Sequence, residues 1–317
     1  MHIGLLTDSL SSLTRADALD VAAELGVETV EIGLGGIHGG WSPAPHADLE
    51  ELLHSASARA RLARDIESRG LRLEAFNAAG NPLHPRHGDR DDHVLRGAIR
   101  LAEEFGIDTV VTMSGLPAAS GDSFPAWITT VWPPENLELL EHQWGRAVQY
   151  WDGLAAEAGR RGVKIAVEMH ANQLVYSVPG LLRLRETVGD TVGANLDPSH
   201  LFWMGADPIE AAAALSGAIH HVHAKDTRIE SRAAVSSRLE TIPNDRVAER
   251  AWNYVAVGAG HPDGAAFWAR FVGAVADAGY GGPLSIENED YSLGQRESVT
   301  LAVTTLREAL ATYAGSR

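Results

Sequence analysis

Short runs of aliphatic and β-branched residues alternate along the chain with longer segments whose apolar residues recur at helical spacing. Such alternation indicates parallel strands joined by helical crossovers. The short runs predict eight strands, at Ile3–Thr7, Val27–Ile32, Leu71–Asn77, Ile107–Met113, Val163–Met169, Val192–Asp197, Ile219–Ala224 and Leu284–Glu287. The longer segments predict helices at Arg15–Leu25, Leu49–Arg69, His93–Phe105, Glu135–Arg161, Gly180–Val188, Pro208–Leu215, Ala265–Ala278 and Gln295–Tyr313.

Eight strand–helix units favour closure into a (β/α)8 TIM barrel, an α/β fold, over an open doubly wound sheet. An open sheet would need a phosphate-binding turn after an early strand, and Gly33-Leu34-Gly35-Gly36 does not complete the dinucleotide spacing. The chain shows no domain boundary or internal repeat, so we expect one barrel domain over residues 1–317. Two connections are longer than usual barrel loops, namely Ser114–Pro134 after the fourth strand and Lys225–Pro262 after the seventh.

The composition of the 317 residues narrows the chemistry. Hydrophobic residues make up 45% and charged residues 21%, as in globular proteins. The absence of cysteine excludes thiol nucleophiles, disulfides, iron–sulfur clusters and cysteine zinc sites. The 26 basic and 42 acidic residues leave a net charge of −16, which disfavours binding to nucleic acid or to an anionic membrane. Neither a signal peptide nor an apolar run of roughly 20 residues is visible, so we expect a cytoplasmic protein.

Polar residues end most of the predicted strands. In barrels of this type the chemistry takes place at the carboxyl ends of the strands. The second strand carries Glu31, and the third ends in Asn77. The ends of the later strands carry more polar and ionisable residues. These are Glu168 and His170 at the fifth strand, Asn195, Asp197 and His200 at the sixth, His221, His223, Lys225 and Asp226 at the seventh, and Glu287 and Glu289 at the eighth. The alternation in His221-Val222-His223 of the seventh strand points His221 and His223 to one face.

Four consecutive strand ends carry side chains that can bind a metal ion: Glu168, Asp197, His223 and Glu287. Three carboxylates in a partly buried barrel mouth repel one another, and a divalent cation removes that repulsion. Carboxylate and imidazole ligands without thiolate suit Mn²⁺, Mg²⁺, Co²⁺ or Zn²⁺, and we expect one Mn²⁺ ion. Taken singly, each residue also has a structural interpretation: an ion pair for Glu168, a turn cap for Asp197 and a satisfied polar contact for His223.

The chain resembles the sugar phosphate isomerase/epimerase family in four places, at Glu168, the Asp197-Pro-Ser-His200 turn, the His221-Val-His223-Ala-Lys-Asp226 strand and the Ser285-Ile-Glu287 strand. That family has the xylose-isomerase-like barrel and includes D-tagatose 3-epimerase and inosose dehydratase and isomerase. The resemblance covers nearly the whole chain. It implies that the four strand-end residues are the metal ligands and that the two glutamates move protons. It also implies a substrate-hydroxyl ligand at His200. Arg228 lies one residue from the position at which those epimerases keep a substrate-binding arginine.

The same superfamily includes metal-dependent apurinic endonucleases. These need histidines at the ends of the third and fourth strands, where this chain has Asn77 and Ser114. The missing histidines and the acidic composition argue against a role in DNA repair.

The resemblance and the strand-end residues lead to one mechanistic hypothesis. A metal-bound carbonyl of a keto-sugar activates the neighbouring carbon, and Glu287 or Glu168 removes its proton to give an enediolate. Return of the proton gives isomerisation or epimerisation, whereas loss of a β-substituent gives elimination. His170 and His200 shuttle protons or hold hydroxyl groups. Lys225 orients the ligand or, in the structural alternative, forms an ion pair with Asp226 or Glu287.

The loops that we expect above the barrel mouth suggest how the substrate is held. We expect a small-molecule carbohydrate to contact His200, Arg228, Lys225, Asn77, His84 and Trp203. Five tryptophans fall in predicted loops or helix starts: Trp41, Trp127, Trp132, Trp203 and Trp252. Their rings either pack against sugar C–H surfaces or anchor the loops and a subunit interface. A subunit interface formed by these rings would make the protein a homo-oligomer, which we expect.

Two alternative functions remain open. The long loops leave room for a 3-keto-glycoside, as in the catalytic subunit of C-glycoside deglycosidases, which resemble the same barrel family and pair with a small second subunit. The other alternative is a non-catalytic barrel that binds a metal and a sugar. Exchange of substrate protons distinguishes the enzymes from the binding protein.

Overall fold

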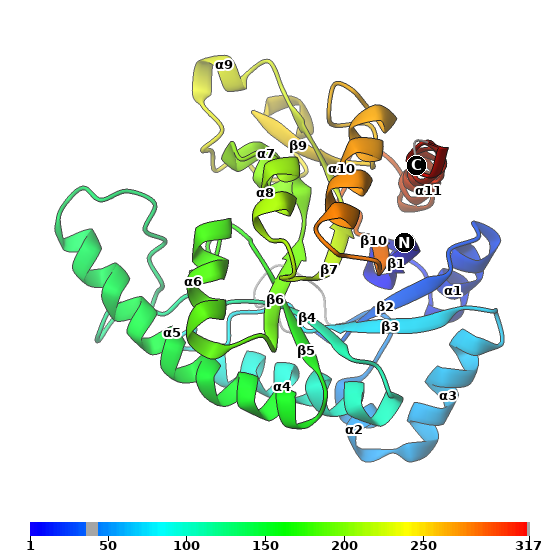
Figure 1. The fold of residues 1–317 in the computed structure, drawn as a ribbon, viewed down its shortest axis with the longest axis horizontal. Coiled ribbons are helices and arrows are strands. Elements are labelled where there is room, and N and C mark those ends of the chain that lie inside the picture. Colours follow the sequence, from blue (N-terminus) through cyan, green and yellow to red (C-terminus); the bar gives the residue numbers. More distant parts are fainter. Residues whose placement is uncertain (36–43, 316–317) are drawn as a thin grey trace. The chain divides into compact units, whose positions relative to one another are not determined.

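The structure is a computed structural model that describes residues 1–35 and 44–315 (Figure 1). Its eight parallel strands form a closed barrel in the order β1-β10-β7-β6-β5-β4-β3-β2, which confirms the (β/α)8 prediction. The barrel strands are β1 (His2–Leu6), β2 (Thr29–Gly33), β3 (Arg72–Asn77), β4 (Thr109–Met113), β5 (Lys164–Glu168), β6 (Val192–Leu196), β7 (Ile219–Ala224) and β10 (Pro283–Ile286).

Helices connect these strands, as the apolar periodicity predicts, but two short helices, Pro198–Met204 and Ala233–Ser236, were not predicted. They are α1 (Arg15–Glu24), α2 (Leu49–His54), α3 (Ala56–Glu67), α4 (Gly88–Phe105), α5 (Glu135–Arg160), α6 (Val178–Val188), α7 (Pro198–Met204), α8 (Pro208–Ala214), α9 (Ala233–Ser236), α10 (Ala265–Asp277) and α11 (Gln295–Gly315), with 3-10 turns η1 (Thr7–Leu10) and η2 (Val247–Glu249). Within the described ranges, no helix combines the length and the apolar character needed to cross a bilayer.

The prediction of a single helix over Leu49–Arg69 is wrong. Two helices, α2 and α3, share that segment, and Ser55 between them has an extended backbone with φ −130° and ψ 105°. The Ser55 hydroxyl accepts a hydrogen bond from the backbone N–H of Ala58 at 3.1 Å. Serine favours such capping positions because its side chain competes with the helical backbone for hydrogen bonds. The apolar periodicity continues across the break and therefore does not reveal it.

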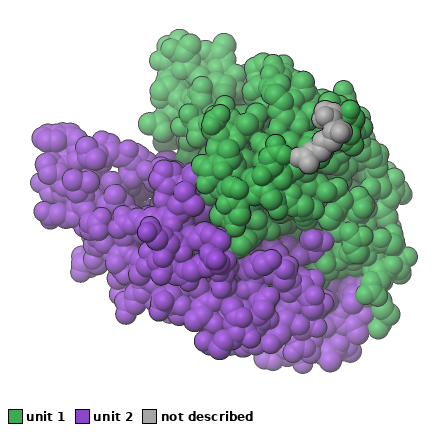
Figure 2. Space-filling view, viewed as in Figure 1, with its two compact units in different colours: residues 1–31, 64–73, 196–317 green, residues 32–63, 74–195 purple. Residues whose placement is uncertain are grey.

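The chain divides into two compact units, which are coloured separately in Figure 2. Unit 1 comprises residues 1–31, 64–73 and 196–317, and unit 2 comprises residues 32–63 and 74–195. In unit 1, β1 pairs with β10 and with β2, and β10 pairs with β7 so that Ser285 lies beside His223. Gly4 in β1 leaves no room for a side chain, because a Cβ there would lie 3.0 Å from Thr29 Oγ1 and 3.1 Å from Pro283 Cβ.

Unit 2 contains the paired strands β4, β5 and the first part of β6. Small side chains form a buried cluster on successive strands, with Ala75 on β3, Val111 on β4 and Ala166 on β5. The long connection after β4 is anchored to α5. Trp151 donates its Nε1–H to the carbonyl oxygen of Ser114 at 2.9 Å, and Gln143 donates to that of Pro117 at 2.8 Å. This connection is therefore held by buried side chains of the helix that follows it.

The second long connection, Lys225–Pro262, is not only a loop. It contains an antiparallel pair of strands, β8 (Asp226–Ile229) and β9 (Trp252–Val255), which the sequence did not predict. Thr227 lies directly opposite Tyr254, so their side chains share one face of the pair. The hydroxyl of Thr227 donates to the carbonyl oxygen of Ser199 on α7 at 2.9 Å. This face of the β8–β9 pair therefore packs against α7, the helix that follows the end of β6.

Candidate functional site

The side chain of Asp197 lies between β6 and α7. It caps the helix, because its Oδ1 accepts a hydrogen bond from the backbone N–H of Ser199 at 2.7 Å. The segment predicted as a turn is therefore the first turn of a helix, with Pro198 at its start. One turn along, His200 is fully buried, and its Nε2 lies 3.3 Å from Asp197 Oδ2. The helix thus fixes these two side chains relative to each other.

His223 and Glu287 join Asp197 in one buried cluster. His223 is on β7, and Glu287 directly follows the neighbouring strand β10. The Nδ1 atom of His223 lies 3.0 Å from Glu287 Oε2. One ligand atom from each of the three residues lies within 4.8 Å of the other two, and their exposed fractions are 2%, 0% and 9%. Three of the four predicted metal ligands, all in unit 1, are therefore brought together.

These three residues fit a divalent cation. Among the residues that the structure describes, Asp197 Oδ2 and Glu287 Oε2 are buried oxygen atoms that accept no hydrogen bond of good geometry. Nitrogen atoms of His200, His223 and Lys225 lie 3.0–3.4 Å from these two oxygen atoms. A buried carboxylate oxygen without a hydrogen bond costs free energy, and a bound cation removes that cost. Two carboxylates and an imidazole are also a donor set that Mn²⁺, Mg²⁺, Co²⁺ and Zn²⁺ accept.

The electrostatics of the cluster keep both carboxylates ionised. Burial raises the pKa of Glu287. The positive charges of Lys225 and His223 lower it by more than burial raises it, so the pKa lies far below the usual range. Burial likewise raises the pKa of Asp197, and the neighbouring His200 lowers it to a net decrease. Burial lowers the pKa of His223, whereas the charges of Glu31 and Glu287 raise it well above the usual value. Metal-free protein thus balances the carboxylates with protonated groups.

Lys225 is the main positive charge beside the cluster. Its ammonium group is 2% exposed and lies 3.4 Å from Glu287 Oε2 and 2.5 Å from Glu289 Oε2. The predicted ion pair with Glu287 is thus present, whereas the contacts of Asp226 are with the backbone around Gly258 and with Trp268. Burial lowers the pKa of Lys225, but Glu287 and Glu289 raise it to a value well above normal.

Tyr254 is a residue of this cluster that the sequence did not indicate. Its hydroxyl lies 2.9 Å from His200 Nδ1, and its ring lies 4.4 Å from the Lys225 ammonium group. Tyr254 belongs to β9, and only the register of the β8–β9 pair brings it to α7. The alternation in Trp252-Asn253-Tyr254-Val255 is the signal that could have revealed this strand.

Two tryptophans lie on the same face as Tyr254. Trp203 on α7 stacks on Trp252 of β9 with ring centroids 4.8 Å apart and an angle of 3° between the ring planes. Trp252 lies in a strand rather than in the predicted loop. The pair anchors the β8–β9 segment to α7, so the structural interpretation of these two rings is correct in part.

Arg228 is not brought to the cluster. Residues alternate between the two faces of a strand, and Thr227 takes the face that packs on α7. Arg228 therefore projects from the other face, where its Nε bonds Glu230 Oε1 at 2.8 Å. Its side chain is 39% exposed. The position does not support the substrate-binding role that we expected from the resemblance.

The remaining predicted residues belong to unit 2. Glu168 is the last residue of β5, is 3% exposed and accepts a hydrogen bond from Asn195 Nδ2 at 3.4 Å. Asn77 ends β3 and accepts from the backbone N–H of Ala79 at 2.9 Å. His84 stacks on His87 with ring centroids 4.8 Å apart. His170 lies two residues after β5, with its Nδ1 2.6 Å from the carbonyl oxygen of Ala171. Glu168 and Asn77 thus occupy the strand ends at which the sequence predicted them.

The comparison with known proteins decides the family. Residues 19–310 match the family described as "Xylose isomerase-like TIM barrel". The chain belongs to this family. It is also 44% identical over 317 residues to the uncharacterized protein YfiH of Bacillus subtilis (strain 168), with 98% of this chain and 99% of that protein covered. The predicted family resemblance is therefore confirmed.

Solved structures with the same fold include two of note. One is the IOLI protein with a binding zinc atom, with a TM-score of 0.68, 19% identity and 99% of each chain covered. Another is a D-tagatose 3-epimerase-like protein, with a TM-score of 0.67, 18% identity, and coverage of 100% of this chain and 99% of that chain. At these identities the similarity shows the fold.

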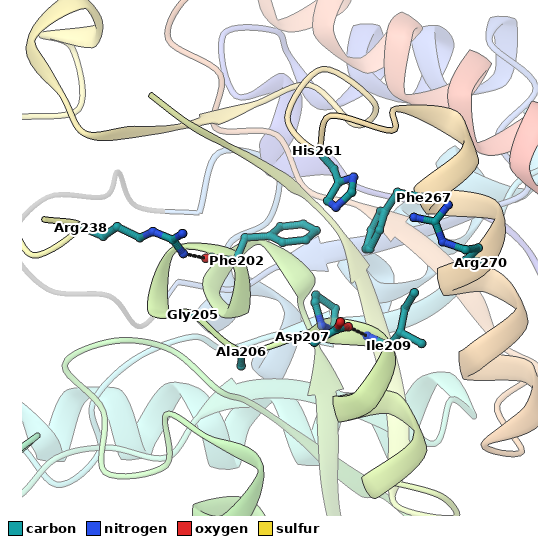
Figure 3. Close-up of a pocket in the computed structure, with 10 residues that line it drawn as sticks. Phe202, Gly205, Ala206, Asp207, Ile209, Arg238, His261, Phe267 and Arg270 are labelled. Atoms are coloured by element: carbon teal, nitrogen blue, oxygen red, sulfur yellow. Dashed lines mark hydrogen bonds between the residues drawn. The ribbon is translucent and has the colours of Figure 1, made fainter. Parts of the chain in front are cut away.

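A separate pocket lies elsewhere in unit 1 and has a volume of about 310 Å³. Figure 3 shows that the rings of Phe202, His261 and Phe267 lie along it, with Arg238 and Arg270 at its margins. Both arginines are engaged, Arg238 by the carbonyl oxygen of Phe202 at 2.7 Å and Arg270 by Asp263 at 2.5 Å. None of the predicted site residues lines this pocket.

The other predicted loop tryptophans have different environments. The ring of Trp127 packs edge-to-face on Tyr176 with centroids 5.3 Å apart, whereas Trp132 is 74% exposed. Trp41 lies outside the described residues. The exposed ring of Trp132 is available for contact with another molecule, while Trp127 is an internal anchor of its loop.

Proposed function

We propose that this protein is a divalent-metal-dependent sugar isomerase or epimerase that forms an enediolate by removing a proton next to the carbonyl of a keto-sugar. The observation that carries the proposal is the buried cluster of Asp197, His223 and Glu287 at neighbouring strand ends, with two carboxylate oxygens that accept no good hydrogen bond among the described residues. Membership of the xylose isomerase-like barrels supports it, as does the likeness to a D-tagatose 3-epimerase-like protein.

The metal site would contain Asp197, His223 and Glu287, with Glu168 at the end of β5 as the fourth ligand. We propose one ion, with Mn²⁺ first and with Mg²⁺, Co²⁺ or Zn²⁺ as alternatives. The solved structure of the IOLI protein with a binding zinc atom supports a divalent ion in this fold. A divalent cation held there supplies Lewis-acid polarisation of a carbonyl oxygen.

The proton transfers are assigned to the residues of the chain. Glu287 or Glu168 removes the proton from the carbon beside the carbonyl, and the other glutamate or His170 returns it. Glu287 is buried and ionised, so an oxygen that can accept a proton is present at the cluster. His200 is held by Tyr254 and faces Asp197, which suits it to bind a substrate hydroxyl.

Further contacts would orient the carbohydrate. We propose Lys225, His200 and Trp203 as the contacts from unit 1, and Asn77 and His84 as those from unit 2. The buried Lys225 and the acidic groups around it favour a neutral sugar with several hydroxyl groups. We also propose that the protein is cytoplasmic and a homo-oligomer, for which the exposed Trp132 is a candidate contact.

Proton NMR in D₂O tests this function directly, with Mn²⁺-loaded protein and a panel of keto-sugars and 3-keto-glycosides. Deuterium uptake next to the carbonyl, with an isomer or epimer as product, is the expected result. Elimination from a 3-keto-glycoside would instead identify the lyase alternative, with a small second subunit as its partner. No exchange in metal-loaded protein would contradict the enzyme and favour a sugar-binding barrel.

A further inference from the structure

The carboxylate of Glu31 lies in a second buried cluster next to His223. It is 1% exposed and belongs to β2, whose neighbour β1 pairs in turn with β10. Its Oε2 accepts a hydrogen bond from the Ser285 hydroxyl at 2.8 Å and lies 2.9 Å from His221 Nε2. Both of its oxygens lie 3.2 Å from His223 Nε2. Side chains from two other strands, β7 and β10, therefore converge on this carboxylate.

The two ring nitrogens of His223 face different carboxylates. Its Nδ1 faces Glu287 Oε2 at 3.0 Å, on the side of the proposed metal ligands, while Nε2 faces Glu31. An imidazole that binds a metal through one nitrogen carries a proton on the other, and that proton needs an acceptor. Glu31 is placed to be this acceptor.

The surrounding residues hold Glu31 in that position. His221 and His223 are two residues apart on β7, so both point to the same face of the strand. Ser285 lies beside His223 in the parallel register of β10 and β7. Its hydroxyl and the His221 ring both contact Glu31 Oε2, which fixes the orientation of the carboxylate.

A second metal ion between Glu31, His221 and His223 is the competing interpretation, since their ligand atoms also lie within 4.8 Å of one another. The observations favour the positioning role. The Glu31 oxygens already contact Ser285 and both imidazoles. In contrast, Asp197 Oδ2 and Glu287 Oε2 accept no good hydrogen bond from the described residues.

We propose that Glu31 is a positioning residue that accepts the Nε2–H of His223 and so presents Nδ1 to the metal, with His221 and Ser285 holding the Glu31 carboxylate in place. The inference rests on the proposed function, because it takes His223 to be a metal ligand. It adds a structural reason for Glu31 of β2 and for His221 of β7, neither of which the proposed reaction uses.

Titration calorimetry with Mn²⁺ tests this role without using activity. Full-length wild-type protein and the Glu31→Gln, Ser285→Ala and Glu230→Gln variants are compared. Glu230 is the matched control, because its carboxylate bonds Arg228 on the other face of the β8–β9 pair. We expect one ion per chain, Mn²⁺ affinity weakened about 10–100-fold in Glu31→Gln and by less in Ser285→Ala, and no change in Glu230→Gln.

A second readout follows the ring of His223 itself. In Zn²⁺-loaded wild-type protein, long-range ¹H–¹⁵N spectra should show the proton of His223 on Nε2. In Glu31→Gln that resonance should shift strongly, while circular dichroism and the thermal midpoint show that the variant is folded. If Glu31→Gln does not fold, Ser285→Ala provides the same comparison.

The outcomes separate this inference from the proposed function. Wild-type protein that binds Mn²⁺ while Glu31→Gln binds it equally tightly would overturn the positioning role alone. Two ions per chain, one of them lost in Glu31→Gln, would make Glu31 a ligand and also overturn it. Wild-type protein that binds no Mn²⁺, Mg²⁺, Co²⁺ or Zn²⁺ would overturn the proposed function and this inference together.

Discussion

The buried carboxylate of Asp226 and those of Asp197 and Glu287, all in unit 1, form two groups that are satisfied in different ways. Asp226 at the start of β8 is fully buried and accepts five hydrogen bonds, from the backbone N–H groups of Thr227, Gly258, Gly260 and His261 and from the Nε1–H of Trp268. In the other group, Asp197 and Glu287 each have an oxygen that accepts no good hydrogen bond within the described ranges. The neighbours of that second group are the ionisable His200, His223 and Lys225.

We take this difference to separate a structural carboxylate from the carboxylates of the proposed metal site. The donors around Asp226 are neutral and fixed, and they hold the loop that leads into α10. That loop approaches so closely that a Cβ at Gly260 would lie 2.3 Å from Asp226 Oδ1. The neighbours of Asp197 and Glu287 can move protons or give way to a cation. Burial alone therefore does not identify a site, whereas the type of hydrogen-bond partner does.

Removing the charge of Glu287 should have the largest effect. We expect Glu287→Gln to lower the rate of substrate proton exchange by about 1,000-fold or more, because one change removes both a proposed metal ligand and a proposed base. Exchange is measured by proton NMR, and circular dichroism checks the fold. Glu230→Gln is the matched control and should exchange at the wild-type rate. Near-normal exchange in Glu287→Gln would remove this residue from the mechanism.

Removing the charge of Asp226 should affect stability rather than chemistry. An asparagine amide would point N–H groups at some of the five donors, so we expect Asp226→Asn to lower the free energy of unfolding by about 1–3 kcal/mol. Urea denaturation measures the loss. Asp263→Asn, which breaks an exposed ion pair with Arg270, is the control and should leave the free energy of unfolding close to the wild-type value. If Asp226→Asn protein that is folded exchanges substrate protons much more slowly than wild-type protein, Asp226 is not a purely structural carboxylate.

The pH dependence of stability should have opposite signs for the two groups. In metal-free protein the pKa values of Asp197 and Glu287 are lowered in the folded state, so their stabilisation is present above the ordinary values of 3.8 and 4.5 and is lost as the pH falls further. Burial raises the pKa of Asp226, and its hydrogen bonds lower it by less. Its stabilisation is therefore complete below 3.8 and is lost as the pH rises through the folded-state pKa.

Urea unfolding at a series of acidic pH values measures these slopes. We expect the free energy of unfolding of wild-type protein to fall as the pH drops below 4.5. The fall should be shallower in Glu287→Gln and steeper in Asp226→Asn. If the free energy of unfolding falls with pH equally steeply in Glu287→Gln and Asp226→Asn, the two groups do not contribute to the pH dependence of stability with opposite signs.

The smallest effect is expected at Arg228. Because its side chain lies on the face of β8 opposite to Thr227 and bonds Glu230, we expect Arg228→Ala to leave KM within about twofold of the wild-type value. Steady-state kinetics with the substrate found by NMR measure this. A large rise in KM would restore the substrate-binding role suggested by the family resemblance and would show that position in the strand misled us.

Much of the fold could be predicted from the sequence, because the strands and helices have clear apolar patterns. The seventh strand was predicted with its observed ends, and Asp197 and Glu287 stand directly after short apolar runs. The break at Ser55 was missed because the apolar periodicity of α2 continues into α3.

The missed parts of the site depend on contacts that local pattern does not encode. Tyr254 reaches His200 through the register of two short strands inside a polar segment. Glu31 was visible as an acidic residue at a strand end, but its contacts come from strands about 190 and 254 residues further along the chain. Such pairings follow from closure of the barrel rather than from the neighbouring residues.

Anomalous X-ray diffraction from crystals grown with Mn²⁺ tests the central claim most directly, because it locates the ion. We predict one strong anomalous peak per chain, about 2.0–2.3 Å from carboxylate oxygens of Asp197 and Glu287 and from Nδ1 of His223. No peak there at saturating Mn²⁺, with His223 still in contact with Glu287, would contradict the metal site and the function proposed from it.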